Sequence, residues 1–539
     1  MTKVFGKQVA RARWLGIIAS LAVIALVSCS TTGSTSNTAG TEGTVNVKIT
    51  DAAAYGYDNV WITVKSLWFH TDDAAGPGDS GWLKYDVTPY TVDLLTLSNG
   101  NLSTAIWDNI KLPVGTYKQI RLLLAGTAAV LTASASADGL NYNNEVVDAS
   151  GAHPLWIPDY SHGIRLAGTF AVSSSTPLNL AIDFDAGDDI VDITRKGVTE
   201  YFLKPRLAYF DLDNVGAIVG TIDSAAAANA ATAEFVFKAE APNDDTTPAE
   251  YHVVKRSTVY DTTNNQFVLY PLAPGTYDII MRGVGYETVI LKGVSVTKGT
   301  TPSSEATVIP TITMTPGTDY TVTADDGVLT PTGSWINFYQ TLPLTGELPY
   351  EIRHRDLNPF TGGFKIFKLS SSSILSGAYV DGTTVPTLTA YTPVEGGVLG
   401  GFQAVQKAEL YNRSAAVIVT PTSNTDLATA GFAALTPSTP SANSISGTIS
   451  VPAELQNKMD SGKLFIVYGG MILNTIDVAS QMVTGGAYTM SNLPGGAAYT
   501  IYGVDAIGWS STTSVVSVGV PAIANLSTGN ATGINLSML

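Results

Sequence analysis

Four aspartates gather near one turn of the chain and form its densest cluster of carboxylate oxygens: Asp183, Asp185, Asp188 and Asp189. Apolar residues alternate over residues 178–184, which predicts a strand with one face in a core and Asp183 and Asp185 on the other face, about 6.6 Å apart. Ala186-Gly187 would turn the chain so that the remaining two aspartates converge on them. Calcium prefers oxygen ligands of this kind. The cluster therefore predicts a calcium site, with a solvated strand end and turn as the alternative interpretation.

Aromatic residues offer a second candidate binding site. Trp335, Asn337 and Tyr339 alternate with Ile336 and Phe338, so a strand here would place the first three on one face. If the opposite face is core, two rings and an amide form a platform, a combination that suits a sugar. The alternative is that the two rings pack under a neighbouring loop or domain.

Patterns that could indicate catalysis are weaker than the two candidate binding sites. Gly78-Asp79-Ser80-Gly81 has the form of a serine nucleophile turn, but His70 lies only ten residues upstream across a predicted hairpin. A serine hydrolase needs a base on the hydroxyl and an acid that orients the base. The five histidines are scattered singly, without the short spacing of a zinc site: His70, His153, His162, His252 and His354. We expect no enzyme activity and no cofactor other than the candidate calcium.

The single cysteine indicates where the protein is located. Leu26-Val27-Ser28-Cys29 follows an apolar stretch, residues 15–27, that is shorter than the roughly 20 residues needed to cross a bilayer. Four basic residues precede it: Lys3, Lys7, Arg11 and Arg13. This order resembles the signal peptide and lipobox of bacterial lipoproteins, which implies cleavage before Cys29 and acylation of that residue. The alternative is an ordinary secretory signal with an incidental cysteine.

Charge and localisation follow from the same segment. Ser30, rather than aspartate, comes after Cys29, which resembles lipoproteins sent to the outer membrane. The net charge is −16, and removal of the four basic residues gives −20 for the mature chain. Such an acidic chain is not expected to bind nucleic acid. We expect a lipid-anchored protein of the bacterial cell envelope whose partners are the membrane and a glycan or surface protein.

The fold class predicted from composition and periodicity is all-β, with tandem β-sandwich domains behind a signal peptide and a flexible tether. Residues 30–43 are mostly Ser, Thr, Gly and Asn and cannot bury enough surface to fold. The predicted segments are a signal peptide (1–28), a lipidated cysteine with its tether (29–43), a first sandwich (44–213), a second (214–315), a third β domain with a linker (316–441) and a last sandwich (442–539).

Six phrases carry a resemblance over residues 45–213: Ile49-Thr50-Asp51, Val92-Asp93-Leu94-Leu95-Thr96-Leu97, Leu112-Pro113-Val114-Gly115-Thr116-Tyr117, Ile120-Arg121-Leu122, Ile182-Asp183-Phe184-Asp185-Ala186 and Leu203-Lys204-Pro205. Their order resembles the bacterial family of domains of unknown function numbered 4382. The resemblance implies a β-sandwich of a secreted or surface lipoprotein and no known activity.

An internal repeat supports the later segments. Gly216 to Ile222 leads to Leu272-Ala273-Pro274-Gly275-Thr276-Tyr277, and Ile445 to Ile449 leads to Leu493-Pro494-Gly495-Gly496 and then Tyr499. The two units resemble carboxypeptidase-regulatory-like, transthyretin-like sandwiches, a fold also grouped with starch-binding-like modules. We expect Tyr277 and Tyr499 to occupy equivalent buried positions.

Three classes of function stay open at this point. The first is a non-enzymatic envelope lipoprotein that presents sandwich domains for binding, adhesion or scaffolding. The second is an array of carbohydrate-binding modules for glycan capture. The third is a hydrolase, which would need a convergent acid, base and nucleophile that the linear sequence does not show.

Overall fold

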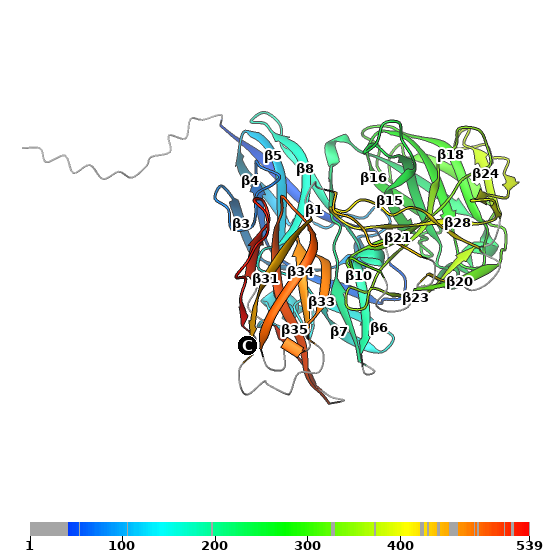
Figure 1. The fold of residues 1–539 in the computed structure, drawn as a ribbon. Helices are drawn as coiled ribbons and strands as arrows, with labels where there is room; N and C mark the ends of the chain where they lie inside the picture. Colours follow the sequence, from blue (N-terminus) through cyan, green and yellow to red (C-terminus); the bar gives the residue numbers. More distant parts are fainter. Residues whose placement is uncertain are drawn as a thin grey trace, which may run out of the picture. The chain divides into compact units, whose positions relative to one another are not determined.

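The computed structural model describes residues 41–52, 54–104, 106–195, 198–324, 329–370, 373–420, 425–427, 431–438, 442–451, 462–478, 480–481, 485–510, 513–518 and 522–537. Strands dominate, and they form separate sheets along the chain (Figure 1). The prediction of tandem β-sandwiches is confirmed. No helix in these ranges is long and apolar enough to span a membrane. The predicted signal peptide, Cys29 and most of the tether lie outside the described residues.

The first sandwich spans residues 42–211. Its strands are β1 (Glu42–Ala52), β2 (Asn59–His70), β3 (Leu83–Asp93), β4 (Trp107–Pro113), β5 (Gly115–Leu124), β6 (Glu145–Asp148), β7 (Gly151–Trp156), β8 (Ile164–Val172), β9 (Leu178–Asp185), β10 (Ile190–Arg195), β11 (Val198–Leu203) and β12 (Ala208–Asp211). Its short helices, with one that follows β12, are η1 (Leu94–Leu97), α1 (Ala133–Ala137), α2 (Ala186–Asp189) and η2 (Leu212–Asn214).

The second sandwich spans residues 216–312. It contains β13 (Gly216–Ile222), α3 (Ser224–Ala227), α4 (Ala230–Ala233), β14 (Val236–Pro242), β15 (His252–Val259), β16 (Phe267–Leu272), β17 (Gly275–Arg282), β18 (Thr288–Val296) and β19 (Thr307–Ile312).

The third sandwich spans residues 319–426. It contains β20 (Asp319–Ala324), β21 (Trp335–Gln340), β22 (Tyr350–Asp356), β23 (Phe364–Ser370), β24 (Ile374–Ala378), β25 (Thr389–Tyr391), β26 (Val394–Glu395), β27 (Val398–Leu399), β28 (Phe402–Lys407), β29 (Val417–Val419) and β30 (Thr425–Asp426). The pair β24 and β25 extends the sheet of the second sandwich, because β24 lies parallel to β18.

The fourth sandwich spans residues 442–537. It contains β31 (Ala442–Ser450), β32 (Lys463–Tyr468), β33 (Met471–Asp477), β34 (Gly486–Pro494), β35 (Ala498–Ser510), β36 (Thr513–Val518), β37 (Ala522–Asn525) and β38 (Leu536–Ser537).

All four sandwiches share one strand topology. In one sheet the first strand pairs antiparallel with a middle strand and parallel with a later strand: β4-β1-β9, β16-β13-β19, β23-β20-β30 and β34-β31-β38. The other sheet repeats one strand order: β3-β2-β5-β8, β15-β14-β17-β18, β22-β21-β28-β29 and β33-β32-β35-β36. The sequence revealed this repeat in two of the four units.

A buried tyrosine marks the same turn in three of them. Tyr277 and Tyr499 are buried, and their hydroxyls donate to the carbonyl oxygens of Ala273 and Pro494, at 2.7 Å in both cases. Tyr117 makes the equivalent bond to Pro113 at 2.9 Å. The predicted equivalence of Tyr277 and Tyr499 is therefore confirmed.

The second sandwich has a sheet that is buried on both faces. Ile279, Met281 and Leu291 lie in its own core, whereas Ile280 and Ile290 lie in the core of the third sandwich. Because strand side chains alternate between faces, a run of consecutive apolar residues is what burial on both faces requires. This packing brings β14, β15 and β17 beside the third sandwich. The exact domain boundaries stay predictions.

Candidate functional site

A cavity of about 290 Å³ lies where the first three sandwiches meet. Its walls come from the end of β9 with α2, from β15, and from β21 with β22. Six of the seven residues that the sequence singled out as metal or sugar ligands line it: Asp183, Asp185, Asp188, Asp189, Trp335 and Asn337. The two predicted sites are therefore parts of one cavity. Tyr339, the seventh, is not part of the wall.

The alternation of β9 positions the aspartates as expected. Leu180, Ile182 and Phe184 are buried in the first core, so Asp183 and Asp185 lie on the opposite face. That face meets β15 of the second sandwich. The guanidinium of Arg256 forms an ion pair with Asp183, and the hydroxyl of Ser257 donates to Asp185 Oδ2 at 3.0 Å.

Backbone donors also reach the carboxylates of the predicted calcium site, which stays a prediction. Asp185 Oδ1 accepts the backbone N–H of Asp188 at 3.2 Å, and Asp189 accepts the backbone N–H groups of Asp185 and Arg206. Among the described residues, no three His, Cys, Asp or Glu side chains are arranged to hold a metal ion. The sequence showed the carboxylates but not the donors that a neighbouring sandwich brings to them.

Burial is the main influence on the charge of this cluster. Burial raises the pKa of Asp189 to about 7, although the nearby Arg206 guanidinium lowers it. Burial, reinforced by Asp188 and Asp189, also raises the pKa of Asp185 well above its ordinary value. The pKa of Asp51 on β1 is also raised, because Asp51 is buried beside Asp185 and Asp183. The cluster therefore carries less negative charge than four free carboxylates would.

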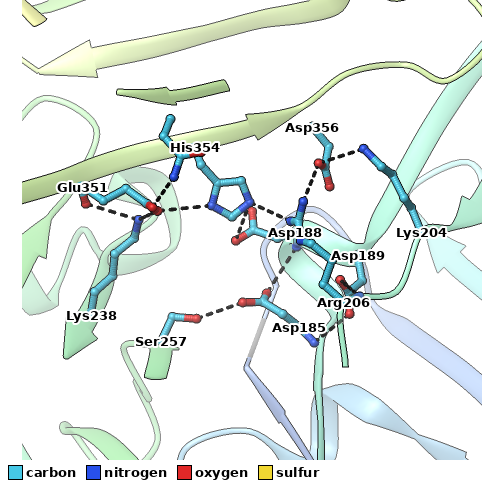
Figure 2. A network of polar contacts seen from close by, with 11 residues as sticks. Asp185, Asp188, Asp189, Lys204, Arg206, Lys238, Ser257, Glu351, His354 and Asp356 are labelled. Carbon is cyan, nitrogen blue, oxygen red and sulfur yellow. Dashed lines mark hydrogen bonds and ion pairs between the residues drawn. The ribbon is translucent and has the colours of Figure 1, made fainter. Parts of the chain in front are cut away.

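His354 connects the aspartates to the third sandwich (Figure 2). Its Nε2 lies 3.2 Å from Asp188 and 3.0 Å from Arg206, and its Nδ1 lies 3.5 Å from Glu351. Glu351 is also 3.1 Å from the ammonium of Lys238. Burial alone would raise the pKa of Glu351, but Lys238 and His354 hold it below its usual range.

A second ion-pair group closes the other side of the network. Lys204 and Arg206, which follow β11, reach Asp356 at 3.0 and 2.7 Å. Burial opposes ionisation of Asp356, yet Arg206 and Lys204 lower its pKa to about 2. Burial lowers the pKa of Lys204 to about 8, although Asp356 acts in the other direction. This network joins the first sandwich to the third (Figure 2).

The predicted aromatic platform is only partly exposed. Asn337 and Tyr339 are only 4% and 3% exposed. Asn337 Nδ2 donates to Glu351, and Tyr339 packs against Tyr251, which directly precedes β15, and against the Lys407 ammonium. Trp335 stays partly exposed, with the Arg206 guanidinium 4.7 Å from its ring centroid. Tyr339 therefore matches the alternative interpretation, in which the ring packs under a neighbouring domain.

The other histidines that the sequence analysis named make local contacts. His70 Nε2 lies 3.0 Å from the backbone oxygen of Ser80, and its Nδ1 accepts the backbone N–H of Asp72. His153, His162 and His252 each lie near one aspartate. This arrangement fits a hairpin loop at Ser80.

Sequence reasoning missed the cations of this site. Lys204 was noted within a family motif, but Lys238, Arg206 and Arg256 were not singled out. One signal was available, because Lys238 stands between Phe237 and Ala239 in a strand and Lys204 directly follows Phe202-Leu203. A cation in such an apolar setting needs a partner. Which carboxylate supplies it depends on the packing of separate sandwiches.

No curated protein matches the chain. Among solved structures, the major pilin subunit BcpA of Bacillus cereus is 11% identical, with 60% of this chain and 99% of that chain covered and a TM-score of 0.14. A tetra-tandem repeat from the extending region of a large adhesion protein is 9% identical, with 76% and 95% covered and a TM-score of 0.09. TM-scores this low do not establish a shared fold. Residues 42–205 match the family described as "Domain of unknown function (DUF4382)", which agrees with the motif resemblance in the first sandwich.

Proposed function

We propose that this protein is a non-enzymatic lipoprotein of the bacterial cell envelope that uses tandem sandwiches for binding, adhesion or scaffolding. The observation that carries the proposal is the repetition of one sandwich topology four times in the chain. Repeated sandwiches give a protein length and many loops without an active site. The second and fourth units are proposed to be carboxypeptidase-regulatory-like modules.

The polar junction between sandwiches supports this interpretation. Its ionised groups are used in pairs that cross from one sandwich to the next: Asp183 with Arg256, Glu351 with Lys238, and Asp356 with Lys204 and Arg206. Loss of one partner of a buried ion pair strongly destabilises a protein, because the other charge stays buried without compensation. Such pairs favour a fixed arrangement of neighbouring sandwiches, which suits a scaffold.

Cys29 would supply the anchor. Two or three acyl chains on one residue hold a protein at a membrane far more durably than a single chain. The tether after Cys29 would separate the sandwiches from the membrane surface, and Ser30 favours the outer membrane.

A second candidate function is glycan capture. It is favoured by the cavity that contains the partly exposed Trp335 together with Asn337, whose Oδ1 is buried without a hydrogen-bond partner. A sugar hydroxyl could donate to this oxygen while a ring packs beside the indole.

The test is to probe residues 42–539, which form one compact unit, against a glycan array and against bacterial surface extracts in a pull-down. Saturable binding to a defined glycan or surface protein, without turnover of it, is expected. Trp335→Ala should weaken glycan binding, whereas Trp82→Ala, at a partly exposed indole away from the cavity, should not. Hydrolysis of any bound glycan or peptide would contradict the non-enzymatic proposal.

A further inference from the structure

A second, smaller cavity of about 130 Å³ adjoins the first and has a different character. Asp185, Asp188, Lys238, Ser257 and His354 line both cavities. The smaller one adds three arginines: Arg282 at the end of β17, and Arg353 and Arg355 on β22. The second and third sandwiches thus bring three arginine side chains to the wall of one cavity.

Two of these guanidinium groups lack protein partners. Arg282 Nε is buried and has no hydrogen-bond partner. In the part of the chain that the structure describes, the side chains of Arg282 and Arg355 form no hydrogen bond and no ion pair within 4 Å. Arg353 Nη1 donates to the backbone oxygen of Lys368 at 2.5 Å. A buried guanidinium donor without an acceptor is costly, because arginine has five N–H donors and stays charged.

The nearby carboxylates only partly offset the positive charge. The acids of this wall are Asp185, whose pKa burial raises, Asp188, which also lies beside His354, and Glu234. Burial, together with repulsion from Arg282 and Arg355, lowers the pKa of Arg353 well below its ordinary value. Burial also lowers the pKa of Arg282. Burial therefore disfavours the cationic forms of Arg353 and Arg282.

We propose that Arg282, Arg353 and Arg355 form a binding site for an oxyanion of sulfate or phosphate size. Guanidinium groups bind such anions through paired N–H donors, which would satisfy Arg282 Nε and Arg355 and relieve the repulsion among the three cations. The cavity has about the volume of four water molecules at about 30 Å³ each, which is enough for one tetrahedral anion. The site is a local positive region in a chain of net charge −16.

The continuity of the two cavities indicates what could carry the anion. An ester of sulfate or phosphate on a saccharide would place its anion among the arginines and its ring toward Trp335 and Asn337. The proposal of an anion site depends only on the three arginines, whereas the proposal of a saccharide ligand also rests on the proposed glycan-binding function. Either proposal can be wrong without the other.

The experiment is calorimetric titration of residues 42–539 with sodium sulfate and with sodium phosphate, using sodium chloride at matched ionic strength as the reference. Saturable binding of one stoichiometric oxyanion is expected. Arg355→Gln and Arg282→Gln should each weaken it at least tenfold. Arg413→Gln is the matched control, because Arg413 forms an exposed ion pair with Glu250 outside both cavities. Arg355→Lys, which keeps the charge but not the paired donors, should weaken binding less than Arg355→Gln.

A sulfated disaccharide and its neutral counterpart form the second arm of the experiment. Preference for the sulfated form, lost in Arg355→Gln, would support a saccharide ligand. Binding of inorganic anion without preference between the saccharides would leave the anion site in place and remove the saccharide. Absence of saturable sulfate and phosphate binding, or equal binding by wild type and both Gln variants, would overturn the site. Circular dichroism of each variant identifies any that fails to fold. If a Gln variant does not fold, weaker anion binding by Arg355→Lys than by wild type supports the site, and equal binding contradicts it.

Discussion

At the scale of single residues, the acidic cluster shows how one sequence feature changes meaning with its surroundings. Four aspartates on a free turn would repel one another and invite a cation. In the folded protein, Arg256, Ser257 and backbone N–H groups occupy them, and burial raises the pKa of Asp185 and Asp189. Their proton uptake on folding therefore becomes a property to test.

The first prediction concerns the pH dependence of stability. The folded pKa of Asp189 is raised from 3.8 to about 7, so this group contributes stability that is present below about pH 4 and is lost as pH rises through about 7. At about 1.36 kcal/mol for each pKa unit, this shift corresponds to a loss of about 3 kcal/mol between pH 5 and pH 8. Asp185 changes stability in the same direction.

Asp185→Asn should therefore reduce the loss of stability between pH 5 and pH 8, measured by urea unfolding. The amide can still accept the N–H of Asp188 and donate to Ser257, so the fold should survive. Asp244→Asn, at a side chain that is 89% exposed, is the control and should leave the slope unchanged. A steeper slope in Asp185→Asn than in wild type would contradict the assignment.

At the scale of elements, the fourth sandwich requires its first strand, β31, to lie close to the segment that precedes its last strand, β38. In the fourth sandwich the segment before β38 lies against β31, where the N–H of Ile534 donates to Ser446 at 3.1 Å. Tyr488 donates its hydroxyl to the Ile534 oxygen, and Leu536 is buried. The approach is possible because residue 447 has no side chain.

Gly447→Ala should destabilise the fourth sandwich by about 1 to 3 kcal/mol, the usual cost of overpacking. An added Cβ would lie 1.8 Å from the carbonyl oxygen of Ile534, which is backbone and cannot move aside cheaply. Gly115→Ala is the matched control, since no atom lies within 4 Å of its added Cβ. Thermal unfolding of both variants gives the comparison, and equal melting temperatures would contradict the proposed close approach.

At the scale of the whole molecule, buried ion pairs join sandwiches that the chain connects only by short segments. Arg256 is the clearest case, because its guanidinium also donates to the backbone oxygen of Asp51 at 2.9 Å and to Thr50 at 3.2 Å. The second sandwich thus reaches the first strand of the first. Loss of such a contact should affect both units.

Arg256→Met should destabilise the protein by about 3 to 5 kcal/mol, because it leaves Asp183 buried without its cation. Urea unfolding measures the change. The double variant Arg256→Met/Asp183→Leu should recover much of the loss, and Arg413→Met should have little effect because its ion pair is exposed. A double variant no more stable than Arg256→Met would show that the pair is not the cause.

The anchoring prediction also belongs to the whole molecule. Cys29→Ala should abolish labelling by a fatty-acid analogue and release the protein from the membrane fraction. Since no other cysteine exists, the sandwiches should keep their melting behaviour. Ser28→Ala serves as a control that keeps the acylated residue. Equal lipid label on wild type and Cys29→Ala would refute the anchor.

The sequence by itself determined the local features of this protein. Alternating apolar residues predicted β1, β2 and β9, and the Pro-Gly turns before Tyr277 and Tyr499 predicted two buried rings, because strand period and turn chemistry act over a few residues. The motifs of the first sandwich likewise identified its family resemblance. Only the tertiary structure decided which cations meet Asp183 and Asp185, why Tyr339 is covered, and that Arg282 faces Arg353 and Arg355. These contacts join residues from different sandwiches, and their pairing depends on packing between sheets, which the period of a single strand does not encode.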